Sequence, residues 1–217
     1  LDAVCLFCRF WRERPSDVYD SMITYVLTVT NIVVQVSEAV TKQARHSGLL
    51  QMIGDEFDRA SFGVAASIAR VQRNSLARVS QAAQTEWLLW LVRECRFMSV
   101  LAGLITRHWK TLDKASVAGA LSGLRLIIDL VPGGAVLVAS APNLLDTISV
   151  IASNPLYPAE CAVICDRILD ACQYFDDADD ADDAHTGLYE GFMCTMHAMK
   201  AIVDDGPRDG DCDMENT

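Results

Sequence analysis

The sequence predicts an all-α protein that folds as a single helical domain, and three observations lead to this prediction. Apolar residues recur every three or four positions along most of the chain, which is the spacing of one face of an α-helix. Turn signals such as Ser47-Gly48, Pro132-Gly133-Gly134 and Asn154-Pro155 separate these periodic segments. Hydrophobic residues make up 51 % of the 217 residues and charged residues 22 %, so the chain can fill a substantial core.

The first half of the chain contains three predicted helices, over residues 18–45, 49–60 and 63–84. A turn at Pro15-Ser16-Asp17 precedes the first of them. Residues 24–30 include several β-branched side chains, which lower helix propensity, and a strand is the competing interpretation there. The apolar period of the segment favours the helix.

Two unusually apolar helices are expected in the middle of the chain, over residues 87–105 and 116–131. The first carries Arg93, Glu94 and Arg96 at its centre, and three central charges would be costly in a membrane. We therefore expect both helices to be buried in the core and the other helices to surround them.

The last third of the chain contains four further predicted helices, over residues 135–141, 144–152, 158–172 and 187–203. An acidic run at residues 176–183 is expected to be a solvated loop. We place the single domain at residues 1–204 and a disordered acidic tail at residues 205–217. The sequence shows no internal repeat.

The formal net charge of −11 and the pI near 4.7 argue against nucleic acid as a partner, because phosphate binding needs a positive surface. The sequence contains eight cysteines, and several lie within the apolar helical patterns, where a free cysteine behaves as a small hydrophobic residue. This usage is typical of a reducing, intracellular compartment. We find no signal peptide and no membrane anchor in the sequence.

No phosphate-binding loop, dinucleotide-binding glycine pattern, nucleophile elbow or His-Glu-x-x-His motif is present, so the sequence does not predict an enzyme. The nearest approach to a metal site is a set of four residues with helical spacing: Cys161, Cys165, Cys194 and His197. The favoured interpretation is that these are small residues lining a helical core. We accordingly expect no metal and no cofactor, and we keep a metal protein as an alternative.

The segment at residues 49–59 has the features of a helix that packs against another helix. Leu50, Ile53 and Phe57 fall on one narrow apolar stripe. Gly54 lies beside the stripe and costs about 1 kcal/mol of helix stability relative to alanine, so a close approach of a second helix is its expected purpose. Asp55 is placed beside the stripe, where it can meet an arginine. Spaced apolar anchors with one charge are typical of an amphipathic helix lying in a groove.

At these residues the sequence resembles the Bcl-2 family. The death motif of that family reads Leu-x-x-x-Gly-Asp-Glu followed by a hydrophobic residue, which Leu50, Gly54-Asp55-Glu56 and Phe57 reproduce. About forty residues later the family has Asn-Trp-Gly-Arg, where this chain has Arg93-Glu94-Cys95-Arg96, so only the arginine matches. The chain departs from the pattern again at His46, which replaces an apolar anchor, and it lacks the Gly-Trp of the family's second motif.

The resemblance, which is closer to divergent viral members of the family, implies a bundle around a central hydrophobic hairpin formed by residues 87–105 and 116–131. It implies a cytoplasmic protein, acting also at the mitochondrial surface, that inhibits apoptosis. Such a protein binds the death-motif helix of pro-apoptotic family members in a surface groove. In this interpretation Arg96 lies at the groove rim and pairs with an aspartate of the partner helix. The groove floor is then formed by Phe97, Met98, Leu101 and Leu104.

A second hypothesis is a helical structural or scaffold protein, such as a viral assembly or tegument component, that forms homo-oligomers through an apolar face. In that case the helix at residues 49–59 is only part of the core, and Arg96 pairs within the chain, with Asp55, Glu86 or Glu94 as candidate partners.

Overall fold

The computed structural model describes residues 16–173, and residues 1–15 and 174–217 lie outside the described part. The predicted acidic loop, the predicted helix at 187–203 and the predicted tail therefore lie outside the described residues. Within residues 16–173 every regular element is helical, which confirms the all-α prediction for this part of the chain.

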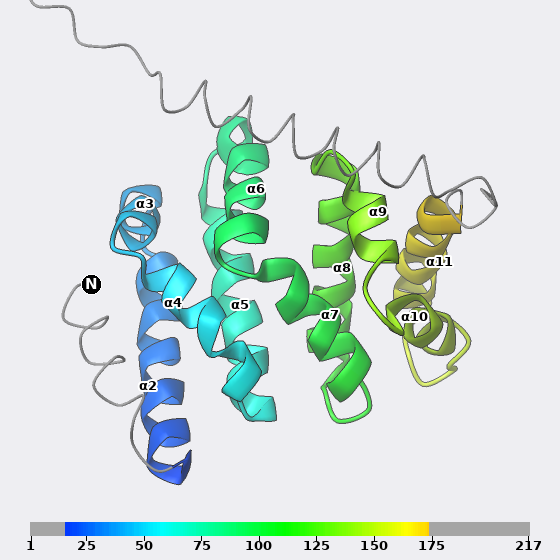
Figure 1. The fold of residues 1–217 in the computed structure, drawn as a ribbon, viewed down its shortest axis with the longest axis horizontal. Coiled ribbons are helices and arrows are strands. Elements are labelled where there is room, and N and C mark those ends of the chain that lie inside the picture. Colours follow the sequence, from blue (N-terminus) through cyan, green and yellow to red (C-terminus); the bar gives the residue numbers. More distant parts are fainter. Residues whose placement is uncertain (1–15, 174–217) are drawn as a thin grey trace, which may run out of the picture. The chain divides into compact units, whose positions relative to one another are not determined.

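The elements run in order as long and short helices, with two short 3₁₀ turns between them (Figure 1). They are α2 (Ser16–Val34), α3 (Glu38–His46), α4 (Leu49–Asp55), η1 (Glu56–Arg59), α5 (Phe62–Arg78), η2 (Gln81–Ala83), α6 (Gln84–Glu94), α7 (Phe97–His108), α8 (Lys114–Leu130), α9 (Gly134–Ala139), α10 (Leu144–Ala152) and α11 (Ala159–Gln173).

The β-branched run at residues 24–30 lies inside α2, so the helical interpretation of this segment is correct. Its low propensity is overcome by burial, because Ile23, Val26 and Thr30 lie on the buried face of the helix. The hydroxyl of Thr28 donates a hydrogen bond to the carbonyl oxygen of Thr24 at 2.8 Å, within the same helix.

Two predicted helices are each broken in the structure. The one expected at residues 18–45 ends at Val34, and α3 begins after Ser37, whose side chain accepts a hydrogen bond from the backbone N–H of Val40. The one expected at residues 87–105 is interrupted at Cys95 and Arg96, and Arg96 adopts the left-handed conformation with φ of 55°.

The break at Arg96 explains the three charges in the apolar run. Arg93 and Glu94 are exposed at the end of α6, and Arg96 is half-buried at the start of α7. The prediction of one continuous buried helix is therefore wrong, and the charges lie where the chain leaves the core.

A three-helix unit recurs along the described residues, although the sequence shows no internal repeat. Each unit has one long helix and two shorter ones: α2–α3–α4, α5–α6–α7 and α8–α9–α10. A further long helix, α11, follows the third unit. The last helix of each complete unit begins directly after a left-handed residue: Gly48 (φ 71°), Arg96 (φ 55°) and Asn143 (φ 60°). A left-handed residue thus precedes the last helix in three successive units, and in this sense it closes each unit.

The long helices also bury the same pattern of side chains. Three of them bury residues at positions i, i+4, i+7 and i+11, and α8 follows the pattern except at its last position. The residues are Tyr19, Ile23, Val26 and Thr30 in α2; Val64, Ile68, Val71 and Ser75 in α5; Val117, Leu121, Leu124 and Ile127 in α8; Cys161, Cys165, Ile168 and Cys172 in α11.

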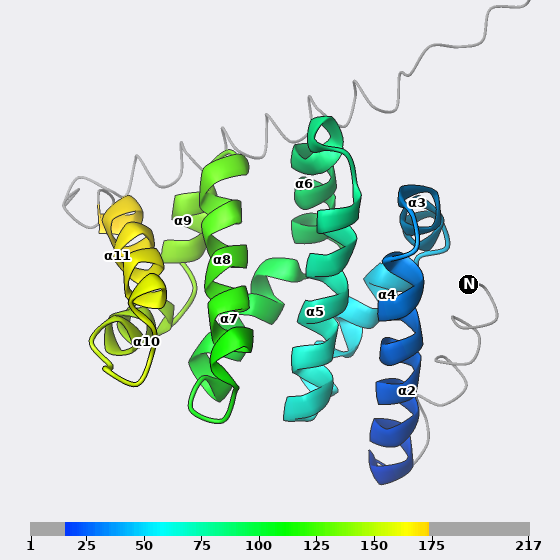
Figure 2. The ribbon, with the colours of Figure 1, turned by 180° about the vertical axis from the view of Figure 1, so that it is seen from behind.

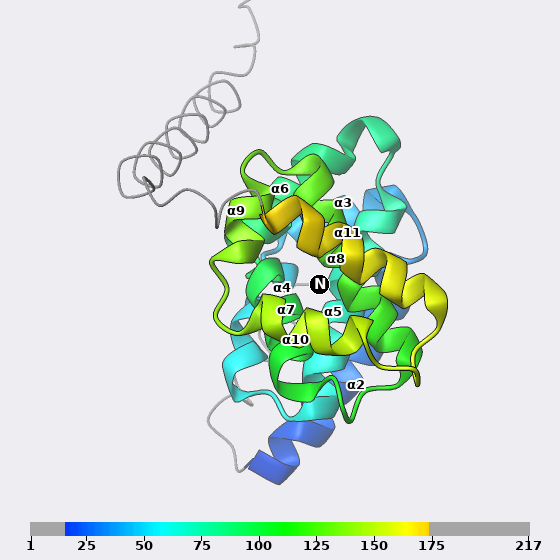
Figure 3. The ribbon, with the colours of Figure 1, turned by 90° about the vertical axis from the view of Figure 1, so that its right-hand side faces the viewer.

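The four long helices follow one another in a row within the described part (Figures 1 and 2). The last short helix of a unit packs on the next long helix, as α7 does on α8 and α10 does on α11, and the end-on view shows α7 and α10 to one side of α8 and α11 (Figure 3). The expected central pair does pack closely as α7 and α8. These two helices occupy the middle of a row, however, and are not surrounded on all sides by the others.

Candidate functional site

The death-motif-like residues belong to the core of the first unit. Leu50 and Ile53 on α4 are buried, as is Phe57 in η1, and Asp55 is exposed. Gly54 makes the close approach that its position in a helix suggests, because a Cβ added to it would lie 2.1 Å from the carbonyl oxygen of Cys95. The segment therefore packs α4 onto the junction between α6 and α7.

Arg96 pairs within the chain. Its guanidinium nitrogen Nη1 lies 2.7 Å from Oδ2 of Asp58, which is none of the three partners expected from the sequence. The hydrogen bond from Arg96 holds the pKa of Asp58 below its ordinary value. Both side chains are substantially exposed, at 37 % and 62 %, so the pair lies at the surface.

The four residues expected to form a groove floor are almost fully buried. Phe97, Met98, Leu101 and Leu104 are between 0 and 7 % exposed. They fill the space where α7 faces the neighbouring helices, and a Cβ on Gly123 of α8 would lie 2.7 Å from a methyl group of Leu101. Arg96 and these four residues therefore do not outline an open groove in the described part.

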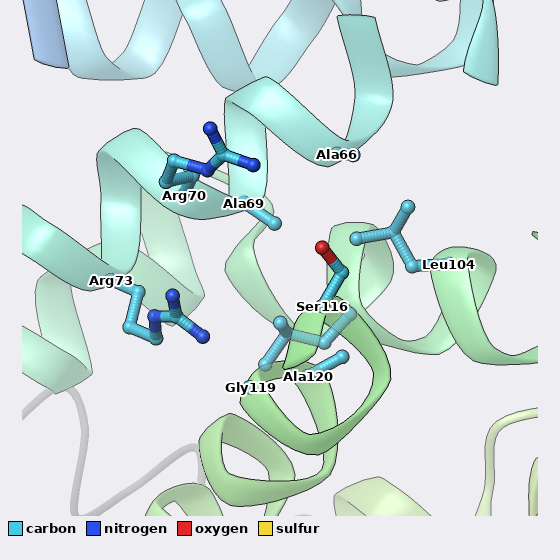
Figure 4. Close-up of a pocket in the computed structure, with 9 residues that line it drawn as sticks. Ala66, Ala69, Arg70, Arg73, Leu104, Ser116, Gly119 and Ala120 are labelled. Atoms are coloured by element: carbon cyan, nitrogen blue, oxygen red, sulfur yellow. The ribbon is translucent and has the colours of Figure 1, made fainter. Parts of the chain in front are cut away.

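A shallow pocket does lie between α5, α7 and α8 (Figure 4). Leu101 and Leu104 of α7 contribute to its lining, so two of the residues expected in a groove do reach a surface depression. The wall from α8 consists of Ser116, Gly119 and Ala120. All of these residues are small or apolar, and the free volume is about 20 Å³.

The wall of the pocket from α5 carries its charge. Ala66 and Ala69 lie beside two arginines, Arg70 and Arg73. The two arginines are one helical turn apart on the face of α5 that meets the pocket. The guanidinium of Arg73 lies directly over Gly119, since a Cβ at that glycine would be 1.6 Å from Nη1.

Arg70 and Arg73 were not identified from the sequence, although a signal was present. Helix α5 contains three arginines and no carboxylate, so neither arginine has an acidic residue three or four positions away with which to pair. No ion pair within 4.0 Å is formed by either residue in the described part of the chain, whereas Arg45, Arg96 and Arg125 each have a carboxylate partner.

The negative charge of the sequence is unevenly distributed. Residues 16–173 carry 13 basic and 14 acidic side chains, a net charge of −1, while residues 174–217 carry 2 basic and 13 acidic ones. The net charge of −11 therefore does not describe the helical units, and a local positive surface on α5 is compatible with it.

The cysteines considered for the alternative of a metal site are core residues where they are described. Cys161 and Cys165 lie on the buried stripe of α11, and burial raises the pKa of Cys165 to about 12. Protonated, desolvated thiols are poor metal ligands. Cys194 and His197 lie outside the described residues, and among the residues described no three His, Cys, Asp or Glu side chains gather as a metal site would require.

Comparison of the chain with family models, curated proteins and solved structures gives no match. Among the helices described, none combines the length and the apolar character that crossing a membrane requires.

Proposed function

We propose that this chain is a protein-binding module built from helical repeats, in which a partner docks on the face formed by α5 and α8. The observation that carries the proposal is the recurrence of the three-helix unit, closed each time by a left-handed residue at Gly48, Arg96 and Asn143. Helical-repeat proteins such as those with armadillo and HEAT repeats stack such units and use the row of corresponding helices as an extended binding surface.

The pocket favours a macromolecular partner over a small molecule. Pockets for small ligands enclose roughly 300–1,000 Å³, whereas this one has a free volume of about 20 Å³. A depression of this size holds a single chemical group. A peptide segment lying across α5 and α8 could place one side chain in it and make its other contacts along the helices.

The hypothesis of an apoptosis regulator stays a prediction. A death-motif helix would need access to Phe97 and Met98 as well as to Leu101 and Leu104. Phe97 and Met98 are buried and do not line the pocket, so α7 would have to separate from its neighbours to expose them. The face formed by α5 and α8 needs no such opening. This difference makes it the better-supported place for a partner.

The proposal is tested by selecting binders from a displayed library of random peptides and locating them on the full chain by hydrogen–deuterium exchange. A panel of death-motif peptides is included in the same assay. We expect protection of amides in α5 and α8, the two helices that flank the pocket. A library that yields no binder, or binders that protect only α3, α6 and α9, contradicts the proposal. Binding of death-motif peptides with protection of α7 would support the apoptosis hypothesis in its place.

Self-association is a second candidate function, favoured by one observation on α2. Tyr25 and Ile32 lie seven positions apart on one face of this helix and are 68 % and 61 % exposed, and Val36, in the turn after the helix, is 70 % exposed. A stripe of large exposed apolar side chains is typical of an interaction surface. If it joins two copies of the chain, sedimentation analysis should show a dimer that Ile32→Glu converts to a monomer. A wild-type chain that stays monomeric at high concentration excludes this function.

A further inference from the structure

We infer that the pocket between α5 and α8 binds an acidic peptide segment, whose carboxylates pair with Arg70 and Arg73. The inference rests on the proposed function and specifies its partner by charge. Three properties of the site support it: the arginines have no carboxylate partner among residues 16–173, the side chains of the walls around them are small, and the floor is apolar.

The first property is that both arginines are open to a carboxylate ligand. Arg70 is exposed and Arg73 half-buried, and neither forms an ion pair in the described part of the chain. A guanidinium can hold a carboxylate through two parallel hydrogen bonds, which makes arginine the preferred residue for such a partner. Residues three positions apart on a helix lie about 5–6 Å apart at Cβ, so neighbouring acidic side chains of one peptide can reach both.

The second property is the space beside the guanidinium groups. Ala66 and Ala69 on α5 face Gly119 and Ala120 on α8 across the pocket (Figure 4). Ala66, Ala69 and Ala120 let the backbone of a bound segment approach the helices closely, beside the guanidinium of Arg73 that covers Gly119. The hydroxyl of Ser116 lies on the same side of α8 and points into the pocket.

The third property is the floor, to which α7 contributes Leu101 and Leu104. A small apolar side chain between two acidic ones would rest there. In such a site the charge pairs at the rim of the pocket fix the register of the peptide, and the apolar contact on its floor adds affinity.

The same features argue against nucleic acid as the occupant. Binding a nucleic acid typically neutralises several phosphates along a track of positive charge, whereas the described residues carry a net charge of −1. Single strands also stack their bases on aromatic side chains, and no aromatic residue lines this pocket.

The inference is tested by fluorescence anisotropy with a labelled ten-residue peptide of alternating aspartate and alanine, against the same peptide with asparagine in place of aspartate. The full chain is compared with the double variant Arg70→Gln/Arg73→Gln and with Arg78→Gln, which alters an exposed arginine of α5 that does not line the pocket. We expect the aspartate peptide to bind the unchanged chain and the asparagine peptide not to bind. Its affinity should fall at least about tenfold in the double variant, as loss of charge-assisted hydrogen bonds predicts, and stay within about twofold in Arg78→Gln.

A second variant tests the geometry without changing charge. Gly119→Ala places a methyl group where Nη1 of Arg73 now lies, and it should displace the guanidinium and weaken binding of the aspartate peptide. The melting temperature of each variant is measured, so that a loss of binding with an unchanged fold is recognised as a change at the site.

Several results would overturn the inference. Equal binding by the double variant and the unchanged chain places the acidic peptide elsewhere. Library peptides that protect α5 and α8 but bind independently of Arg70 and Arg73 would leave the proposed function intact and remove this partner class. If a labelled single-stranded oligonucleotide binds more strongly than the aspartate peptide, the partner is a nucleic acid and not a peptide.

Discussion

Gly54 of α4 touches the carbonyl oxygen of Cys95, since a Cβ on the glycine would lie only 2.1 Å from that atom. The same oxygen accepts a hydrogen bond from Nε2 of Gln72 on α5, at 2.7 Å, and both residues are buried. The carbonyl therefore cannot turn away from Gly54 without losing a buried hydrogen bond. One atom thus joins α4, α5 and the junction between α6 and α7.

This contact predicts that Gly54→Ala destabilises the protein. The added methyl group meets backbone, which cannot move as the end of a flexible side chain can, so the expected cost is about 1–3 kcal/mol of the free energy of unfolding. Chemical denaturation gives the value. Gly63→Ala is the matched control, because nothing lies within 4 Å of a Cβ at that helical glycine. It should be neutral or slightly stabilising through better helix propensity. Equal stability of the two variants would show that α4 does not pack on Cys95.

A second prediction concerns the ion pair between Arg96 and Asp58. Asp58 is exposed and Arg96 half-buried at the surface, so Arg96→Ala should lower the free energy of unfolding by less than about 1 kcal/mol, and by less still in high salt. Because the folded-state pKa of Asp58 is lowered, the contribution of the pair is present above the unfolded pKa of the carboxyl group and disappears as the pH falls through the folded one. Denaturation at neutral and acidic pH checks this.

The same variant separates the two interpretations of Arg96. If a death-motif helix binds at the rim of a groove, Arg96→Ala weakens that binding by about 1–3 kcal/mol while the stability of the protein changes little. If Arg96 only pairs with Asp58 at the junction between α6 and α7, the variant and the unchanged chain have the same affinity for every death-motif peptide, or neither binds any.

The third prediction concerns the start of α8, next to the pocket. The side chain of Asp113 accepts hydrogen bonds from the backbone N–H of Ser116 at 2.9 Å and from its hydroxyl at 2.6 Å. Asp113→Ala should cost about 0.5–2 kcal/mol, as removal of an N-cap does. The hydrogen bonds from Ser116 lower the pKa of Asp113, so this contribution is present above the unfolded pKa and is lost as the pH falls through the lower, folded value.

Asp113→Asn is the control for that effect, because asparagine caps a helix about as well as aspartate but does not titrate. Its stability relative to Asp113→Ala should be independent of pH between 2 and 7 (about the range over which a carboxyl group titrates). If Asp113→Ala, Asp113→Asn and the unchanged chain are equally stable at neutral pH, the cap is not formed in solution.

The fourth prediction uses the thiols of α11. Cys161, Cys165 and Cys172 are buried, and burial raises the pKa of each, so little of the reactive thiolate is present. Alkylation of the native protein, read by mass spectrometry, should spare all three, and denaturation should expose them. Rapid modification of Cys165 in the native protein would show that α11 does not pack on α8 and α10.

Much of the helical architecture was predictable because helical periodicity is local. The buried stripe of α5, for example, can be read from Val64, Ile68 and Val71. The break after α2 was missed because apolar residues continue at Val36 and Val40 on either side of the N-cap at Ser37. The break at Arg96 had no comparable signal. An arginine rarely adopts positive φ, and here the contacts of Cys95 with Gly54 and Gln72, distant in the sequence, accompany it.

The pocket contains two residues that the sequence suggested for a different site. Leu101 and Leu104 were expected in a groove beside Arg96, and the structure places them beside Arg70 and Arg73 on another helix. Proximity along the chain suggested Arg96, but a left-handed turn directs it toward Asp58. Which arginine shares a surface with α7 depends on how successive units stack, and the sequence pattern of one unit does not contain that information.

The last prediction concerns the left-handed residues that close each unit. No atom lies within 4 Å of a Cβ at Gly48, so Gly48→Ala should cost only the backbone energy of a left-handed alanine, about 1–2 kcal/mol. Asn143→Ala should cost less, below about 1 kcal/mol, because asparagine already pays part of that energy. Denaturation curves give both values.

The double variant then tests the repeat itself. Gly48 and Asn143 close the first and third units, so the two losses should add to within about 0.5 kcal/mol, as expected for sites without shared contacts. Arg96→Ala in the middle unit serves as the control. Arginine and alanine both carry a Cβ, so this change leaves the energy of the left-handed backbone at position 96 unchanged. A neutral Gly48→Ala, or two losses that fall far from their sum, would show that these residues do not close independent, equivalent units.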